Sequence, residues 1–308
     1  MQCFLPDKET AMKISVIIPV YNAKEDVRKC LESVKKNFDF SNGEVIIVDD
    51  CSQKETADYL KTEAATNPDK ITLIQNNENS GFPKTCNNGI AKAKGEIIVL
   101  LNSDTEISAG FNKKIADCFD SDPLIAVASP IASYSGSYFI PLRDGETVAS
   151  MNKKIEEAHS PVYPSIPTAE GFCFCIRKEA VDAYGALDEI YGKGFNEERD
   201  FSFRMVKHGL RCVLIDNLYV YHKRHASFGN AERKKQLEKN DKIFKDRWGD
   251  LITYEKDFTK HKNPIDSLRR QIQPKYFKKG LFYTKSVLPD KTVWRIFGIK
   301  ITLKQKTS

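Results

Sequence analysis

The stretch Glu96–Asp104, "EIIVLLNSD", combines the pattern of a buried strand with an acidic end. It holds five consecutive apolar residues, Ile97–Leu101, followed at once by Asn102, Ser103 and Asp104. An unbroken apolar run of this length is typical of a strand buried on both faces, as in a parallel sheet. A carboxylate directly after such a strand suggests a function, because α/β sheets bind ligands at the carboxyl ends of their strands.

The segments before this stretch alternate between strand and helix patterns. We expect strands at Ile14–Val20, Val45–Val48 and Ile71–Ile74, and helices at Asp26–Phe38, Thr56–Ala65 and Lys84–Lys94. This alternation predicts an α/β fold with a doubly wound, mostly parallel sheet. The strand Val45–Val48 also ends in acid, at Asp49 and Asp50. Either acidic end alone is equally well explained as a polar loop, but two such ends favour a ligand site.

The second half of the chain is less regular. The patterns predict a helix at Phe111–Phe119, a strand at Ile125–Ser129, a strand entering a helix at Gly171–Ala180, a helix at Glu198–His208, short strands at Cys212–Ile215 and Leu218–Tyr221, and a polar helix at Ala231–Trp248. Residues 130–168 are rich in Ser, Pro, Tyr and Gly, and we expect a long loop there. Long loops in compact domains tend to be functional or mobile.

The composition is that of an ordinary globular protein, with 41% hydrophobic and 29% charged residues. The eight cysteines include no C-x-x-C pair. Cys173 and Cys175 would share one face of a strand, with Phe174 on the other, so we expect buried thiols in a reducing compartment and no zinc site. No apolar run approaches the ~20 residues of a membrane helix, and the N-terminus lacks a signal-peptide pattern, which predicts a cytoplasmic protein.

Charge is unevenly distributed along the chain. From Lys260 to Ser308 there are thirteen Lys or Arg against two acids, in a chain whose net charge is +6. This basic tail interleaves the aromatic residues Tyr276, Phe277, Phe282, Tyr283, Trp294 and Phe297. The pattern favours docking on an anionic membrane surface, with a solvated tail as an equal alternative. Charge alone would also suit nucleic acid, but no nucleic-acid-binding motif is present, so we expect no such partner.

Six motifs, in order, resemble those of the family 2 inverting glycosyltransferases. They are "VIIPVYNA" (Val16–Ala23), "IIVDD" (Ile46–Asp50), "NSGFPKTCNNGIAKAKGEIIVLLNSD" (Asn79–Asp104), "GALDE" (Gly185–Glu189), "NEERDFSFRM" (Asn196–Met205) and "YHKRHASFG" (Tyr221–Gly229). The resemblance implies the GT-A fold. It divides the chain into an extension at 1–12, a nucleotide-sugar-binding half at 13–105, an acceptor-binding and catalytic half at 106–255, and the basic tail at 256–308. Within the tail, "RIFGIKITLK" (Arg295–Lys304) resembles the ends of bacterial capsule and cell-surface polysaccharide enzymes.

The resemblance assigns a nucleotide-binding role to several residues of the first half. Asp50 would accept a hydrogen bond from N3–H of uracil or thymine, Tyr21 would stack on the base, and Pro19 would supply a backbone contact. Lys84 would reach the diphosphate, although a plain surface lysine explains it nearly as well. The donor is therefore expected to carry UDP or dTDP.

A metal ion is also implied, because the triplet Asn102-Ser103-Asp104 stands where the family usually has D-x-D. Ser103 and Asp104 would belong to the donor site, with Asp104 as the direct ligand of Mn²⁺ or Mg²⁺. His222, which follows a later strand, resembles a further ligand and would favour Mn²⁺ somewhat. Its alternative reading is a hydrogen-bonded histidine at a sheet edge.

The acceptor hydroxyl needs a general base, and "NEERD" supplies three carboxylates in four positions. By its alignment with the family's E-D pair, Glu198 takes the position of the base. Glu197 would support it, and Asp200 would bind the acceptor or brace the loop. The structural alternative is a set of acids that favours the start of a helix. Like charges this close also raise one another's proton affinity.

The sequence thus predicts a metal-dependent inverting transferase that moves a sugar from a nucleotide diphosphate to a glycan or lipid-linked glycan. Processive synthases of the family carry Q-x-x-R-W, which is "FKDRW" (Phe244–Trp248) here, so we expect a non-processive enzyme in bacterial surface-polysaccharide synthesis. We expect it in the cytoplasm, docked on the inner face of the membrane if the tail binds there. The alternatives are an inactive nucleotide-sugar-binding scaffold and, more weakly, a nucleotidyltransferase.

Overall fold

The computed structural model describes residues 12–223, 231–273, 283–288, 291–296 and 299–304. The chain divides into two compact units, Met1–Asn263 and Pro264–Ser308. The tail boundary expected at residue 256 therefore falls within the long helix that ends the first unit.

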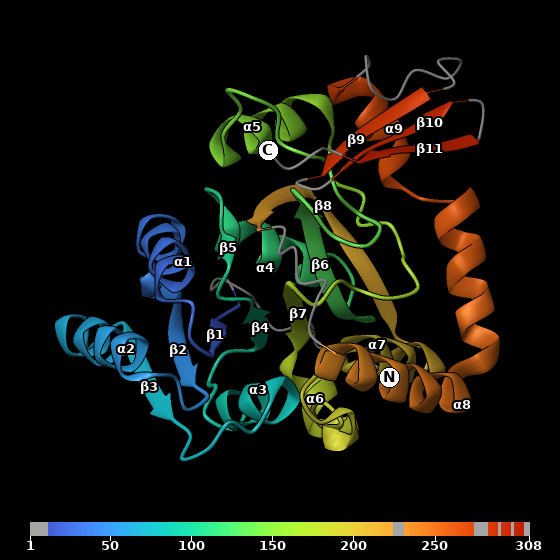
Figure 1. Cartoon of the computed structure of the whole chain (residues 1–308). Coiled ribbons are helices and arrows are strands. Elements are labelled where there is room, and N and C mark those ends of the chain that lie inside the picture. The colour runs from blue at the N-terminus through green and yellow to red at the C-terminus, as the bar shows by residue number, and fades with distance from the viewer. Residues whose placement is uncertain (1–11, 224–230, 274–282, 289–290, 297–298, 305–308) are drawn as a thin grey trace, which may run out of the picture. The chain divides into compact units, whose positions relative to one another are not determined.

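The described part of the first unit is built on one eight-stranded sheet with the order β3-β2-β1-β4-β7-β6-β8-β5 (Figure 1). Its strands are β1 (Ile14–Val20), β2 (Gly43–Asp49), β3 (Ile71–Gln75), β4 (Ile97–Leu101), β5 (Thr105–Glu106), β6 (Ile125–Ala132), β7 (Cys173–Arg177) and β8 (Arg211–His222). β1 pairs in parallel with both β2 and β4, while β7 runs antiparallel between β4 and β6. The mixed, mostly parallel sheet confirms the expected α/β class.

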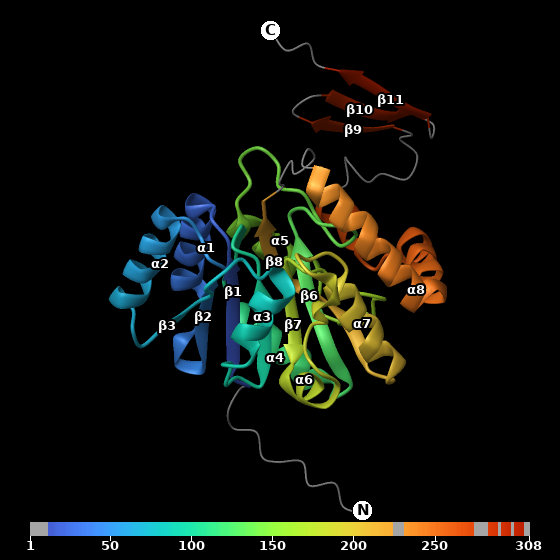
Figure 2. The same cartoon turned by 60° about the horizontal axis from the view of Figure 1, so that its bottom comes forward.

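Helices pack on both faces of this sheet (Figure 2). The helices described in this unit are α1 (Lys24–Asn37), α2 (Lys54–Thr66), α3 (Phe82–Ile90), α4 (Phe111–Ser121), α5 (Val148–Ala158), α6 (Lys178–Tyr184), α7 (Glu197–Lys207) and α8 (Ala231–His261), the last of which packs on α7. Short 3₁₀ turns lie at Phe40–Asn42 (η1) and Glu189–Tyr191 (η2). Every residue of β1 is buried, because alternate side chains meet helices on opposite faces. Val16 joins the core that contains Val27 of α1, whereas Ile17 lies beside Gly89 of α3.

Three local predictions were wrong. Residues 130–168 contain a helix, α5, whose start is fixed by a capping box between Thr147 and Ser150. The two short strands expected near residues 212–221 form one strand, β8, whose pairing with β6 shifts after Pro130. The last large helix continues past Trp248, where the backbone kinks, to His261.

The seven cysteines of the described residues are free thiols, and all but Cys51 are buried. Cys173 and Cys175 lie in the core on one side of β7, as expected. Phe174 points to the other side, where its ring contacts that of Phe201 at 5.9 Å between centroids. Among the residues described, no helix is long and apolar enough to cross a membrane.

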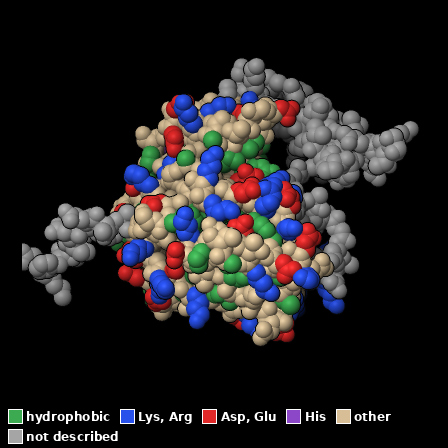
Figure 3. Space-filling model, turned by 90° about the vertical axis from the view of Figure 1, so that its left-hand side faces the viewer, with side chains coloured by type: hydrophobic (Ala, Val, Ile, Leu, Met, Phe, Trp, Pro, Cys, Tyr) green, Lys and Arg blue, Asp and Glu red, His purple; other side chains and the backbone are tan. Residues whose placement is uncertain are grey.

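The surface formed by α1 and α2 is an ordinary solvated face. Acidic and basic side chains are interspersed over the side of the molecule seen in Figure 3. On α1, Arg28 pairs with Glu25 at 2.7 Å and with Glu32 at 2.5 Å. Such one-turn ion pairs support exposed helices by a few tenths of a kcal/mol each.

The described part of the second unit contains α9 (Ile265–Ile272) and an antiparallel sheet of β9 (Tyr283–Leu288), β10 (Lys291–Ile296) and β11 (Ile299–Lys304). The expected basic tail therefore includes regular secondary structure. Tyr276, Phe277, Phe282 and Phe297 lie outside the described residues, as do residues 1–11 and 224–230. The expected membrane contact of the tail stays a prediction.

The packing of α3 on the sheet gives the first testable prediction. A Cβ on Gly89 would overlap the Ile17 side chain and lie 3.1 Å from Val48 Cγ2, so we expect Gly89→Ala to lower the free energy of unfolding by about 1–3 kcal/mol. Gly249→Ala is the matched control, since Gly249 is also helical but has open space around it. Helix propensity favours alanine in both, so the control should be neutral or stabilising in urea unfolding. Equal effects of the two changes would contradict this packing.

Candidate active site

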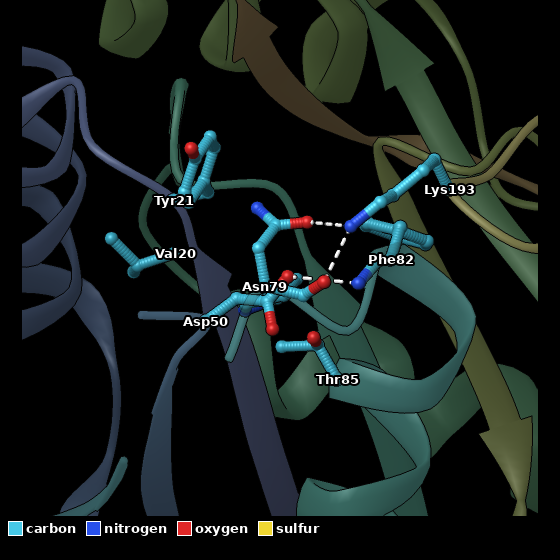
Figure 4. A pocket seen from close by; sticks show the side chains of 9 residues that line it. Val20, Tyr21, Asp50, Asn79, Phe82, Thr85 and Lys193 are labelled. Atoms are coloured by element: carbon cyan, nitrogen blue, oxygen red, sulfur yellow. Dashed lines mark hydrogen bonds between the residues drawn. The ribbon is translucent and has the colours of Figure 1, made fainter. Parts of the chain in front are cut away.

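An open cavity of about 310 Å³ lies at the carboxyl ends of β1 and β2. Its lining is Pro19, Val20, Tyr21, Asp50, Asn79, Gly81, Phe82, Thr85 and Lys193 (Figure 4). The structure thus brings together Pro19, Tyr21 and Asp50, the residues expected around a nucleobase. Tyr21 is 56% exposed, so its ring is available to a ligand.

Asp50 is buried at the base of this cavity and organises the loop before α3. Its Oδ1 accepts hydrogen bonds from Asn76 Nδ2 and from the Ser80 backbone N–H, both at 2.8 Å. Its Oδ2 accepts one from the Gly81 N–H at 3.0 Å. A carboxylate offers about four acceptor positions, so Asp50 keeps one, on the oxygen that receives a single bond.

Asp49, the neighbouring acid, has a different place. It is also buried, and its carboxylate accepts from the Ser52 N–H at 2.9 Å and from Gln75 Nε2 at 3.2 Å. These bonds close the turn after β2. Of the two acids that end this strand, only Asp50 lines the cavity.

The lysine in the cavity lining is Lys193, not Lys84. Lys84 is exposed on α3 and is not part of the lining, so its contact with a diphosphate stays a prediction. Lys193 comes from the loop before α7, and its Nζ donates to both the backbone and the side-chain oxygen of Asn79 (Figure 4). Lys193 is not among the residues expected from the sequence, although its position between Gly192 and Gly194 is typical of a loop that approaches another segment closely.

Asp104 and His222 are brought together by strand pairing. The two-residue strand β5 begins directly after Asp104 and pairs antiparallel with the end of β8, with Thr105 opposite His222. His222 Nε2 lies 3.6 Å from Asp104 Oδ1. Ser103 occupies the half-buried turn before them.

The surroundings of His222 suit a metal ligand. Its Nδ1 lies 2.9 Å from the carbonyl oxygen of Tyr134, and its ring stacks on Phe172 at 5.2 Å. A proton on Nδ1 that is donated to this carbonyl leaves the Nε2 lone pair directed towards Asp104. Together they offer one nitrogen and carboxylate oxygens, which fits Mn²⁺ or Mg²⁺, the remaining ligands coming from elsewhere. Among the described residues no third His, Cys, Asp or Glu completes the group.

Glu197 and Glu198 begin α7, whose first turn also contains Asp200. Burial raises the pKa of Glu198; the charges of Glu170 and Glu255 add to this, and that of Arg199 opposes it. Burial and then the charge of Glu198 raise the pKa of Glu197 well above its usual value. Glu197 is 5% exposed, and its Oε2 has no hydrogen-bond partner among the residues described.

Asp200 sits in a structural network. Its Oδ1 accepts from the Tyr191 hydroxyl at 3.0 Å, from Arg247 Nη1 at 3.2 Å and from Trp248 Nε1 at 2.8 Å. It is 2% exposed, so the structure places it as a brace between α7 and α8. The Arg and Trp of "FKDRW" are its partners, and Phe244 of the same motif stacks on Phe203 at 5.5 Å.

The two residues before β7, Gly171 and Phe172, lie between Glu198 and the Asp104–His222 pair. A Cβ on Gly171 would stand 3.2 Å from Glu198 Cγ, so the absence of a side chain at residue 171 gives Glu198 its room. The next residue, Phe172, stacks on His222, and its carbonyl oxygen accepts from the Asn102 N–H at 2.9 Å. The expected base and the expected metal ligands thus flank the same two residues.

Comparison with known proteins agrees with this architecture. Residues 15–185 match the protein family described as Glycosyl transferase family 2. The chain is 34% identical over 111 residues to the poly(ribitol-phosphate) beta-N-acetylglucosaminyltransferase TarS of Staphylococcus aureus strain Mu50. The aligned region covers 35% of this chain and 19% of that protein. The chain is 37% identical over 95 residues to the putative colanic acid biosynthesis glycosyl transferase WcaA of Escherichia coli K12, covering 30% and 33%. The matches thus span only a fifth to a third of these two relatives.

Two solved structures share the fold at low identity. A structure of GalNAc-T7 with UDP, GalNAc and Mn²⁺ superposes with a TM-score of 0.61 at 17% identity, covering 89% of this chain and 57% of the other. The mannosyltransferase PcManGT from Pyrobaculum calidifontis, with GDP-Man and Mn²⁺, gives 0.58 at 17% identity, covering 88% and 75%. Since the family match extends over more than half of the chain and the fold agrees with it, this protein belongs to glycosyl transferase family 2.

Proposed function

We propose that this protein is a metal-dependent, inverting, non-processive glycosyltransferase. It would move a sugar from a UDP or dTDP donor to a hydroxyl of a glycan or lipid-linked glycan in bacterial surface-polysaccharide synthesis. The proposal rests on three features that lie near the carboxyl ends of the strands. They are the cavity lined by Tyr21 and Asp50, the Asp104–His222 pair, and the Glu198 carboxylate, whose pKa is raised.

Donor binding would use the cavity for the base and the Asp104–His222 pair for the diphosphate. Tyr21 offers a ring for stacking, and Asp50 keeps one acceptor position for an imide N–H. A divalent cation held by Asp104 and His222 would neutralise the charge of the leaving diphosphate. The two Mn²⁺-bound structures of similar fold support this choice of metal.

Acceptor activation would fall to Glu198. Its carboxylate is in a helix N-terminus, beside the Gly171–Phe172 segment that leads to His222. It would accept the proton of the attacking hydroxyl, which adds to the face of the sugar opposite the diphosphate and inverts the anomeric carbon. Buried Glu197 would support this position, and Asp200 would hold α7 against α8.

The relatives support the pathway class. TarS and the poly(ribitol-phosphate) beta-glucosyltransferase of Bacillus spizizenii are named for polymer acceptors, and WcaA for colanic acid. An inactive scaffold would have no need for the full set of Asp50, Asp104, Glu198 and His222. A nucleotidyltransferase would not need both a donor pocket and a separate base helix.

A donor screen tests the proposal. The protein is incubated with Mn²⁺ and a panel of UDP-, dTDP-, GDP- and CMP-sugars. We expect slow release of nucleoside diphosphate from one UDP- or dTDP-sugar. This release should be lost in Asp104→Ala. Asp117→Ala, which removes an exposed acid paired with Lys113, is the control and should keep the activity. Release that is equal in Asp104→Ala, or that needs no metal, would refute the proposed donor site.

Glu198→Gln should separate chemistry from binding. Loss of a positioned base costs about 10²- to 10⁴-fold in turnover, while the donor dissociation constant should hardly change. Single-turnover kinetics and nucleotide titration measure the two quantities. Glu179→Gln, at the first turn of α6 and exposed, is the matched control and should turn over normally. A fully active Glu198→Gln enzyme would place the base elsewhere.

The pH profile of turnover should show a displaced acid limb. Glu198 acts as base only when ionised, and its pKa lies above the usual 4.5 because of burial and the charges of Glu170 and Glu255, opposed by Arg199. Turnover should therefore fall as pH drops through a midpoint above 4.5. A midpoint at or below that value, with the protein still folded by circular dichroism, would contradict the assignment.

A further inference from the structure

We propose that Lys193 is a specificity-determining residue that reads the donor's nucleobase, together with Asp50. Its ammonium group would donate a hydrogen bond to the carbonyl oxygen next to the imide N–H that Asp50 accepts. This inference rests on the proposed donor site and adds to it a residue from the half of the protein that contains Glu198. The site would then select uracil or thymine by two groups, Asp50 and Lys193, in place of one.

The position of Lys193 in the cavity is the first support. The side chain lines the same cavity as Tyr21 and Asp50, and in Figure 4 it reaches Asn79 from the opposite side to Tyr21. Within the described residues its Nζ makes no ion pair, and its two hydrogen bonds go to neutral oxygens of Asn79. An ammonium group has three N–H donors, so one remains available, and the bonds to Asn79 can be exchanged for bonds to a ligand.

The backbone around Lys193 is built to bring it there. A Cβ on Gly81 would lie 2.5 Å from the Gly192 carbonyl oxygen and 2.9 Å from Lys193 Cα, so the loop approaches the cavity only because residue 81 is glycine. The same Gly81 donates its N–H to Asp50 Oδ2. One residue therefore fixes both the carboxylate and the path of the loop that bears the lysine.

The loop also has an unusual backbone conformation. Gly192, Gly194, Phe195 and Asn196 all have positive φ, at 59°, 117°, 79° and 75°. For a bulky side chain such as Phe195 this conformation is strained, and it persists only when surrounding contacts impose it. The fully buried Asn240 of α8 supplies such contacts. Its Nδ2 donates to the carbonyl oxygens of Tyr191, Gly194 and Phe195, at 2.8, 2.6 and 3.1 Å.

The hydrogen-bonding pattern of the two groups points to an oxo-pyrimidine. A single free acceptor beside a cationic donor complements the N3–H and adjacent carbonyl of uracil or thymine. Cytosine presents a bare ring nitrogen and an amino group at these places, which sets donor against donor and leaves Asp50 without a proton to accept. Guanine presents two neighbouring N–H donors, one more than the acceptor position that Asp50 retains. A site built to hydrogen-bond one pattern rejects another strongly, because its polar groups are left unpaired.

The test is isothermal titration of the full chain with UDP and, separately, with CDP, each in the presence of Mn²⁺. A hydrogen bond to a charged group corresponds to about 10- to 100-fold in affinity, so Lys193→Met should weaken UDP binding by that factor. CDP binding should not weaken, because the lysine makes no favourable hydrogen bond to cytosine. Lys193→Arg, which keeps a cationic donor, should restore part of the loss. Because Lys193 is exposed, the thermal unfolding midpoint should not move.

Lys92→Met, an exposed lysine just after α3, is the matched control and should bind both nucleotides like the unaltered protein. Equal weakening of UDP and CDP by Lys193→Met would assign the lysine to the diphosphate and overturn base reading. No weakening of either would remove Lys193 from the site altogether. If the unaltered protein binds neither nucleotide, the donor site itself fails, and this inference with it.

Discussion

The parallel pairing of β1 with both β2 and β4 is the constraint on which the site depends. Because these strands share one direction, their carboxyl ends must reach the same edge of the sheet. Asp50 follows β2, Tyr21 follows β1, and Asp104 follows β4. Strands buried on both faces have no freedom to slip in register, since a shift of one residue would exchange the sides of every apolar side chain.

The second half of the protein attaches its chemistry to that edge through short, specific contacts. The β5–β8 pairing sets His222 beside Asp104, and the Gly171–Phe172 segment connects His222 to Glu198. The loop that precedes Glu198 returns to the donor cavity with Lys193. Only four residues of chain separate Lys193 in the donor cavity from Glu198 on α7.

Much of this arrangement is readable from the sequence, and the exceptions have physical reasons. Apolar runs such as Ile97–Leu101 identify buried strands, and the acids after two of these runs indicate the ligand edge, because both signals are local. The helix α5 was missed, although Thr147 is a favourable N-cap, because the surrounding Ser, Pro and Gly suggested a loop. The presence of Lys193 in the donor cavity could not be predicted from the sequence, since it depends on contacts between residues more than a hundred positions apart. The bracing role of Asp200 likewise requires knowing that α8 packs on α7.

Binding of donor and metal at the edge formed by β1, β2 and β4 can be seen by X-ray diffraction from crystals grown with UDP and Mn²⁺, recorded at the manganese absorption edge. We expect one anomalous peak next to Asp104 Oδ1 and His222 Nε2, with the uracil ring against Tyr21 and its imide edge on Asp50. A manganese peak away from this pair, or a base bound outside the Tyr21–Asp50 cavity, would contradict it.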